Sequence, residues 1–195
     1  MDIKEKLQEL NIKKSSYQSM LDERNIRYNE IVKELNVTEN SQSFVQSVAQ
    51  VVQSQLSSQI DTIVNLGLNT CFPGYTFEMK YVASRGKTEV QFVVTDGKSI
   101  IDPLNQCGGG FVDLLCFCLR IAVYSISSVN NVIIFDEPFK FLSKGLRSKV
   151  AELLVTLSDK LNLQIIEVTH IEELAENSNK KFLIKKVNGI SGVVE

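Results

Sequence analysis

The feature that most restricts the fold is the apolar run Val132–Phe135, which ends in the acidic pair Asp136 and Glu137. Four consecutive apolar residues without polar alternation predict a strand buried on both faces, as in a parallel sheet flanked by helices. Ligands bind at the carboxyl edge of such sheets, where these carboxylates stand. Asp136 could hold Mg²⁺, and Glu137 could accept a proton from an attacking water. A solvated acidic turn after a core strand is the alternative.

Composition fits one domain and excludes several kinds of site. The 195 residues are 44 % hydrophobic, enough to bury a core, and the net charge of -2 argues neither for nor against nucleic acid. Four cysteines form no Cys-x-x-Cys pair, and the single histidine cannot complete a zinc site with them. We therefore expect reduced thiols in a cytoplasmic protein. We expect no membrane span and no signal peptide, since the apolar runs are short and the N-terminus is charged.

The N-terminal stretch has the heptad pattern of a coiled coil. Between residues 3 and 35, eight of ten seam positions are aliphatic or Tyr, and Lys14 and Arg24 occupy the other two. No second heptad stretch of similar length follows, so we expect the partner helix to come from another chain or copy. The polar stretch Asn36–Ser43 predicts a break, followed by a second amphipathic helix that ends near Gly67 or Cys71.

Residues 76–101 predict antiparallel strands joined by tight turns, over Thr76–Ala83, Thr88–Thr95 and Ser99–Ile101. Gly86-Lys87-Thr88 matches the end of a phosphate-binding loop. Tyr81 stands where the first glycine of that loop should be, however, and the residues that follow alternate like a strand. We interpret the tripeptide as part of a hairpin turn, and no other segment fits a phosphate-binding loop.

A run of three glycines, Gly108, Gly109 and Gly110, follows Cys107 and leads into an apolar helix predicted over Val112–Ser125. Free N–H groups at the positive end of a helix bind phosphate oxygens, so the run is a candidate nucleotide-binding element. A flexible entry into a buried helix is the alternative.

The chain after the acidic pair alternates between helices and strands and carries the only histidine. An apolar strand ends in Thr169-His170, and parallel strands joined by right-handed crossovers would bring His170 to the same sheet edge as Asp136 and Glu137. The predicted order is a helix, a strand, a short helix and a last strand: Leu146–Leu161, Leu163–Val168, Ile171–Ala175 and Lys181–Val187.

In this order the motifs resemble the C-terminal half of an ATP-binding-cassette (ABC) ATPase of the structural-maintenance-of-chromosomes (SMC) type. The similarity is greatest to the SbcC-like recombination and repair ATPases of bacteria and phages, and it covers the whole chain. It implies an α/β fold, half of an ABC-type head with a parallel sheet, flanking helices and antiparallel strands. It places a coiled-coil helix at 1–38 and the ATPase lobe at 39–195.

The resemblance also implies roles for residues at the sheet edge. Asp136, in the Walker B motif, would coordinate Mg²⁺, and Glu137 would polarise the attacking water. His170 would contact the γ-phosphate of ATP as the switch histidine. Phosphoryl transfer needs charge stabilisation and an oriented water more than covalent chemistry, and these residue types supply both.

The signature and the loop after Pro138 depart from the family pattern. Cys107, Gly108, Gly109 and Gly110 would form the signature that closes over ATP held by an opposing subunit. Cys107 replaces a serine, and a thiol donates more weakly than a hydroxyl. Ser143, which we group with the nucleotide contacts, replaces an aspartate. The N-terminal lobe with its Walker A loop is missing, so we expect no tight ATP binding by the chain alone.

The resulting hypothesis is an ATPase half that pairs with a separate N-terminal lobe in DNA recombination, repair or replication. Mg²⁺ and ATP would be shared with that lobe, a homodimer is a second candidate assembly, and DNA would be met only in the assembled complex. Lys180-Lys181 and Lys185-Lys186 could touch phosphates or form a solvated strand end. The alternative function is a non-catalytic protein that docks on another SMC-like or ABC ATPase and inhibits or tunes it. A split or truncated gene product is the third candidate.

Overall fold

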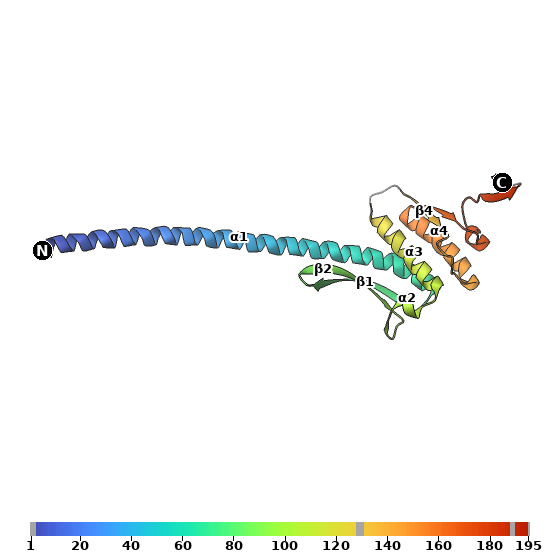
Figure 1. Cartoon of the computed structure of the whole chain (residues 1–195), viewed down its shortest axis with the longest axis horizontal. Helices are drawn as coiled ribbons and strands as arrows, with labels where there is room; N and C mark the ends of the chain where they lie inside the picture. Colours follow the sequence, from blue (N-terminus) through green and yellow to red (C-terminus); the bar gives the residue numbers. More distant parts are fainter. Residues whose placement is uncertain (1–2, 128–130, 188–189, 195) are drawn as a thin grey trace. The chain divides into compact units, whose positions relative to one another are not determined.

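A computed structural model describes residues 3–127, 131–187 and 190–194. The chain forms two units, Met1–Val52 and Gln53–Glu195. The fold class is α/β, as predicted. Figure 1 shows the helices and strands and labels α1, α2, α3, α4, β1, β2 and β4. In chain order they are α1 (Ile3–Cys71), β1 (Thr76–Ser84), β2 (Lys87–Thr95), β3 (Ile100–Ile101), α2 (Pro103–Gln106), α3 (Gly109–Ile126), β4 (Val132–Asp136), α4 (Arg147–Leu161), β5 (Gln164–Val168), β6 (Leu183–Val187) and β7 (Ile190–Val194), with short 3₁₀ helices η1 (Lys144–Leu146) and η2 (Glu172–Ala175).

The first unit is helical throughout its described residues, and the break predicted over Asn36–Ser43 is wrong. The Thr38 hydroxyl donates to the Glu34 carbonyl at 2.8 Å, and the Ser41 hydroxyl donates to the Val37 carbonyl at 2.7 Å. These side chains bond within the helix instead of capping a new one. The heptad spacing therefore continues, with polar residues at a few seam positions.

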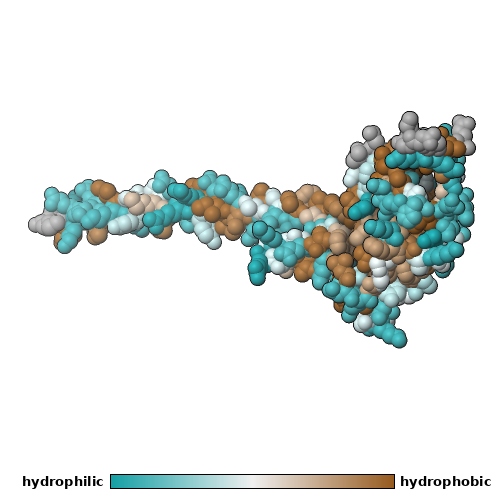
Figure 2. All heavy atoms as spheres, turned by 45° about the vertical axis from the view of Figure 1, so that its right-hand side comes forward, coloured by the Kyte–Doolittle hydropathy of each residue, from teal (hydrophilic) through white to brown (hydrophobic). Residues whose placement is uncertain are grey.

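The apolar seam of the first unit is exposed. Figure 2 shows hydrophobic residues, in brown, at intervals along α1. The exposed seam residues are Ile3, Leu7, Leu10, Tyr17, Leu21, Tyr28, Ile31 and Leu35. Such a stripe is stable in water as one strand of a coiled coil. The prediction that it needs a partner helix, and the domain boundary at 38/39, stay predictions.

The second unit contains the antiparallel sheet β1-β2-β3, in which the hairpin expected from the sequence is confirmed. Arg85 and Gly86 both have positive φ, 49° and 75°, and form its two-residue turn. Lys87 and Thr88 already belong to β2. The Gly86-Lys87-Thr88 segment is therefore the end of a hairpin turn and the start of β2, and it is part of a hairpin as we interpreted it.

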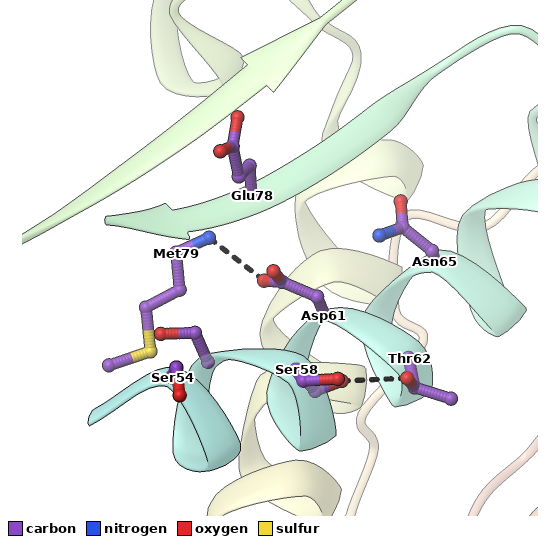
Figure 3. A pocket seen from close by; sticks show the side chains of 8 residues that line it. Ser54, Ser58, Asp61, Thr62, Asn65, Glu78 and Met79 are labelled. Atoms are coloured by element: carbon purple, nitrogen blue, oxygen red, sulfur yellow. Dashed lines mark hydrogen bonds between the residues drawn. The ribbon is translucent and has the colours of Figure 1, made fainter. Parts of the chain in front are cut away.

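Side chains of α1 complete the outer edge of β1. The Asn65 amide accepts from the Phe77 N–H and donates to the Phe77 carbonyl, both at 2.8 Å, and Asp61 Oδ1 accepts from the Met79 N–H at 2.8 Å. Four helical residues advance about as far as two strand residues, so the pairs match in steps. At the next step the Ser57 hydroxyl donates to the Gln53 carbonyl instead, at 2.9 Å. An open groove of about 480 Å³ begins there, beside Asp61 (Figure 3).

The parallel pair β4–β5 is covered on one face only. Phe135 is buried against Phe117 of α3, with ring centroids 4.8 Å apart. The opposite face exposes Ile134 (67 % exposed) and Val168 (54 %), together with Val132 and Ile166. The prediction of a strand buried on both faces is therefore wrong for the second face, although its apolar residues are those of a buried strand.

The last predicted strand does not extend this parallel sheet. β6 pairs with β7 in an antiparallel hairpin, for example Leu183 with Val194. Within the described ranges, the parallel sheet consists of β4 and β5. Ile184 and Val193, which pair across the hairpin, are exposed.

Helix α3 is the centre of the core. Leu114, Cys118 and Ile121 have no exposed surface, and a Cβ added to Gly67 of α1 would clash with the Cys118 Sγ. The glycine therefore permits the close approach of α1 and α3. Among the described residues, α3 is the one helix of sufficient length (18 residues) and mean hydropathy (1.7) to cross a membrane, where we expected no such run. Its packing in the core accounts for that composition.

Candidate functional site

The acidic pair lies at the carboxyl end of β4, as predicted. Asp136 is the last residue of the strand and is exposed. Glu137 has a positive φ of 45°, an uncommon conformation for a residue other than glycine. Its N–H donates to the Val168 carbonyl at 2.9 Å, which extends the pairing with β5 by one residue. The backbone turns sharply at Glu137, and its carboxylate is held beside the end of β5.

The structure brings His170 to Glu137. His170 Nδ1 lies 2.8 Å from both carboxylate oxygens and has hydrogen-bond geometry toward Oε1. The imidazole is 70 % exposed and the Glu137 side chain 34 % exposed. The Glu137–His170 contact therefore holds the two side chains together, and the exposed imidazole remains accessible to a ligand. The catalytic roles given to the two residues stay predictions.

Asp136 fits a magnesium ion that arrives with a nucleotide. The described residues contain no group of three or more His, Cys, Asp or Glu side chains arranged to hold a metal. Mg²⁺ is commonly bound by one or two carboxylates together with water and substrate phosphates. The exposed carboxylate of Asp136 suits that mode and not a preformed metal cage.

The glycine run begins α3 three residues earlier than predicted. Gly108 is the N-cap, and a Cβ there would meet no atom within 4 Å. A Cβ on Gly109 would lie 2.9 Å from the Phe141 Cβ, and one on Gly110 would lie 2.9 Å from the Phe141 carbonyl oxygen. Two of the three glycines therefore have a packing role against the loop that follows Pro138.

Cys107 and Ser143 flank this contact. Burial, with a smaller effect of the Asp102 charge, raises the pKa of the half-buried Cys107 thiol, so it stays protonated at neutral pH. Ser143 is the exposed N-cap of η1 and makes no side-chain capping bond. In the described parts of the chain, no hydrogen bond or ion pair joins the candidate signature, residues 107–110, directly to Asp136, Glu137 or His170.

Sequence comparison finds relatives among the Rad50 ATPases. The chain is 29 % identical over 122 residues to a probable DNA double-strand break repair Rad50 ATPase of Aquifex aeolicus, covering 61 % of this chain and 12 % of the relative. It is 31 % identical over 118 residues to the Rad50 ATPase of Archaeoglobus fulgidus, covering 59 % and 13 %. The relative from Methanocaldococcus jannaschii is 28 % identical over 143 residues, covering 72 % and 14 %. The chain thus spans about one eighth of these relatives. No protein-family model matches it.

Solved structures give the fold. An SMC head domain with an extended coiled coil from Pyrococcus furiosus, bound to the C-terminal domain of ScpA, matches with a TM-score of 0.60 at 18 % identity, over 76 % of this chain and 36 % of that one. The SMC head domain from Thermotoga maritima matches with a TM-score of 0.54 at 19 % identity, over 76 % and 51 %. The chain therefore resembles the C-terminal region of an SMC/Rad50-like ATPase head.

One residue of this SMC/Rad50-like chain was missed from the sequence. Glu167 lies on the covered face of β5, paired with Phe135 of β4. Burial, and then the charge of Glu137, raise the pKa of Glu167 to about 7. The signal was available, because Glu167 is the one ionisable residue in the otherwise apolar run Ile165–Val168.

An ion pair also supports the histidine segment of the SMC/Rad50-like chain. Arg147 Nη1 lies 3.2 Å from both carboxylate oxygens of Glu173, and the two side chains are 27 % and 30 % exposed. Arg147 begins α4, and Glu173 belongs to η2, which follows His170. The pair therefore ties the segment after His170 to the helix that follows the acidic pair. Sequence patterns at a separation of 26 residues do not reveal it.

Proposed function

We propose that this chain is the C-terminal half of an SMC/Rad50-like, SbcC-like ATPase head that acts in DNA recombination, repair or replication. It would supply Walker B, the signature and the switch histidine to ATP bound by a partner N-terminal lobe. The observation that carries the proposal is the 2.8 Å contact between His170 and Glu137 at the edge where β4 and β5 both end. A solvated acidic turn does not require a contact with histidine. A general base must be oriented toward the attacking water, and the contact with His170 orients Glu137.

The residues of this chain suit hydrolysis of a phosphoanhydride. Glu137 would accept the proton of the attacking water, and His170 holds its carboxylate by Oε1. Mg²⁺, when bound with ATP at Asp136, would neutralise charge on the phosphates. The first N–H groups of α3, after Gly108, have no acceptor within the helix and would face phosphate oxygens.

The unfinished sheet supports the requirement for a second lobe. Parallel sheets are normally covered on both faces, whereas Ile134, Ile166 and Val168 are exposed here. Each of β4 and β5 also has one edge without a partner strand among the described residues. The exposed coiled-coil seam offers a second contact to the same lobe. Together these surfaces suit a partner that adds strands and a helix.

The alternative function is regulation without catalysis. Cys107 stands in the candidate signature and Ser143 in the loop after Pro138, in place of the serine and the aspartate expected there. Both replacements would weaken contacts made across a subunit interface. The same apolar sheet face could then dock on another SMC-like or ABC ATPase and tune it. Turnover in a reconstituted pair separates the two functions.

The test combines the purified chain with a lobe that carries a Walker A loop and ends in a heptad helix. We expect Mg²⁺-dependent ATP turnover only in the mixture. Glu137→Gln should abolish turnover and preserve ATP-dependent association, because the base is lost while the interface remains. Glu152→Gln, an exposed glutamate on α4, is the matched control. Unchanged turnover in Glu137→Gln would remove Glu137 from the base role, and association without any turnover would favour the regulatory function.

A further inference from the structure

Glu167 sits behind the acidic pair, on the face of the sheet that the helices cover. Its partner across the strands is Phe135, which is 5 % exposed. Side chains alternate along a strand, so Asp136 belongs to the opposite, exposed face. Glu137, one residue further, is bonded through its N–H to Val168, the neighbour of Glu167. The Glu137 carboxylate is close enough to Glu167 for its charge to raise the pKa of Glu167.

Oε1 of Glu167 is buried and has no hydrogen-bond partner in the described structure. Oε2 of Glu137 is buried too, and it lies 2.8 Å from His170 Nδ1 without the geometry of a hydrogen bond. Ionised carboxylates only accept hydrogen bonds, so two of them together leave both oxygens unsatisfied. Among the described residues, none of the ion pairs includes Glu167. A buried polar atom without a partner is costly, and a single proton between the two carboxyl groups would satisfy both.

We propose that Glu167 is a positioning residue that carries a proton and donates it as a hydrogen bond to Oε2 of Glu137, while His170 holds Oε1. Glu137 is then held at both oxygens. The acid is neutral, so it adds no second negative charge where ATP phosphates would arrive. The direction of the Glu167 pKa, raised by burial and by Glu137, agrees with this arrangement.

The first test measures unfolding of the full chain against pH. The pKa of Glu167 is raised from an ordinary 4.5 to about 7, so between these values the unfolded chain has released the proton and the folded chain retains it. Stability is therefore lost as pH rises through this window and levels off above it. We expect the wild-type folded-to-unfolded ratio to fall by about tenfold or more relative to Glu167→Gln, which cannot ionise. Glu152→Gln should keep the wild-type dependence.

The second test detects positioning. His170 is the only histidine, so its ring protons give a single assignable set of NMR signals. In Glu167→Gln the amide N–H replaces the acid proton, and we expect the His170 shifts to stay at wild-type values at a pH below neutral. In Glu167→Ala no donor remains, and the shifts should move toward those of Glu137→Gln.

Two outcomes would overturn the inference. A wild-type pH dependence in Glu167→Gln would mean that Glu167 does not retain the proton. Equal His170 shifts in Glu167→Gln and Glu167→Ala would mean that Glu167 does not position Glu137. The inference gains its catalytic meaning from the proposed ATPase function, but neither measurement involves ATP or a partner lobe. A failure here is therefore distinguishable from a failure of that function.

Discussion

The Phe141 N–H donates a 2.7 Å hydrogen bond to Oδ2 of Asp113. This bond fastens the loop after the acidic pair to the first turns of α3, where the glycine run begins. The candidate signature and the candidate catalytic strand are thereby linked through one short loop. A shift of the candidate signature would therefore move the loop that follows the candidate catalytic strand, and a shift of that loop would move the candidate signature.

The closeness of this contact predicts different stability costs for substitutions at Gly108 and Gly110. Gly110→Ala should destabilise the chain by about 1–3 kcal/mol, because its Cβ would meet the Phe141 carbonyl oxygen and the Leu142 Cα, which are backbone atoms. Gly108→Ala has open space and should cost under about 1 kcal/mol, from the poorer N-cap alone. Urea unfolding of both variants checks the order. Equal losses would mean that the loop yields to the added methyl group.

The helix-to-strand pairing predicts a local effect of Asn65. Asn65→Ala removes both bonds to Phe77 and should cost about 1–3 kcal/mol, since the Phe77 N–H and carbonyl lose their partners. Hydrogen exchange at the Phe77 amide should accelerate markedly. Asn69→Ala, at an exposed position on the same helix, is the control and should leave that amide protected. Unchanged exchange in Asn65→Ala would show that the amide is protected by other groups.

The exposed face of the parallel sheet predicts a separation of folding from assembly. Ile134→Glu should leave the thermal unfolding of the isolated chain nearly unchanged, because that side chain is already 67 % exposed. The same variant should lose association with the Walker A lobe, measured by analytical ultracentrifugation, because a charge would be buried without a partner. Ile12→Glu, exposed and off the coiled-coil seam, should associate normally. Retained binding by Ile134→Glu would locate the interface elsewhere.

The Cys107 thiol predicts a gain of function. Cys107→Ser would place a stronger donor at the candidate signature, and under the proposed function it should tighten ATP-dependent association of the reconstituted pair several-fold. Cys116→Ser, exposed on α3, should have no effect. Titration of a fluorescent ATP analogue into the reconstituted pair measures the association for both variants. A weaker association in Cys107→Ser would show that the thiol is suited to its site and would favour the regulatory alternative.

Local patterns explain which elements were predictable. Alternation and turn residues identified the β1–β2 hairpin, and apolar runs ending in polar residues identified β4 and β5. The break at Asn36–Ser43 failed because polar side chains in a helix can return their hydrogen bonds to its own carbonyls. The assignment of the last strand to the parallel sheet failed because β6 pairs with the adjacent strand β7, which the sequence analysis did not predict.

The sequence by itself determined the elements and the residue types at the sheet edge, because hydrophobic period and turn preference act over a few residues. Only the tertiary structure decided that His170 meets Glu137, 33 residues away, and that Gly109 and Gly110 admit the Phe141 loop. It also decided that Glu167 is half-buried on the covered face of β5 and that the opposite sheet face is exposed. These features depend on which surfaces are buried together, and burial is a property of the packed chain and not of any one segment.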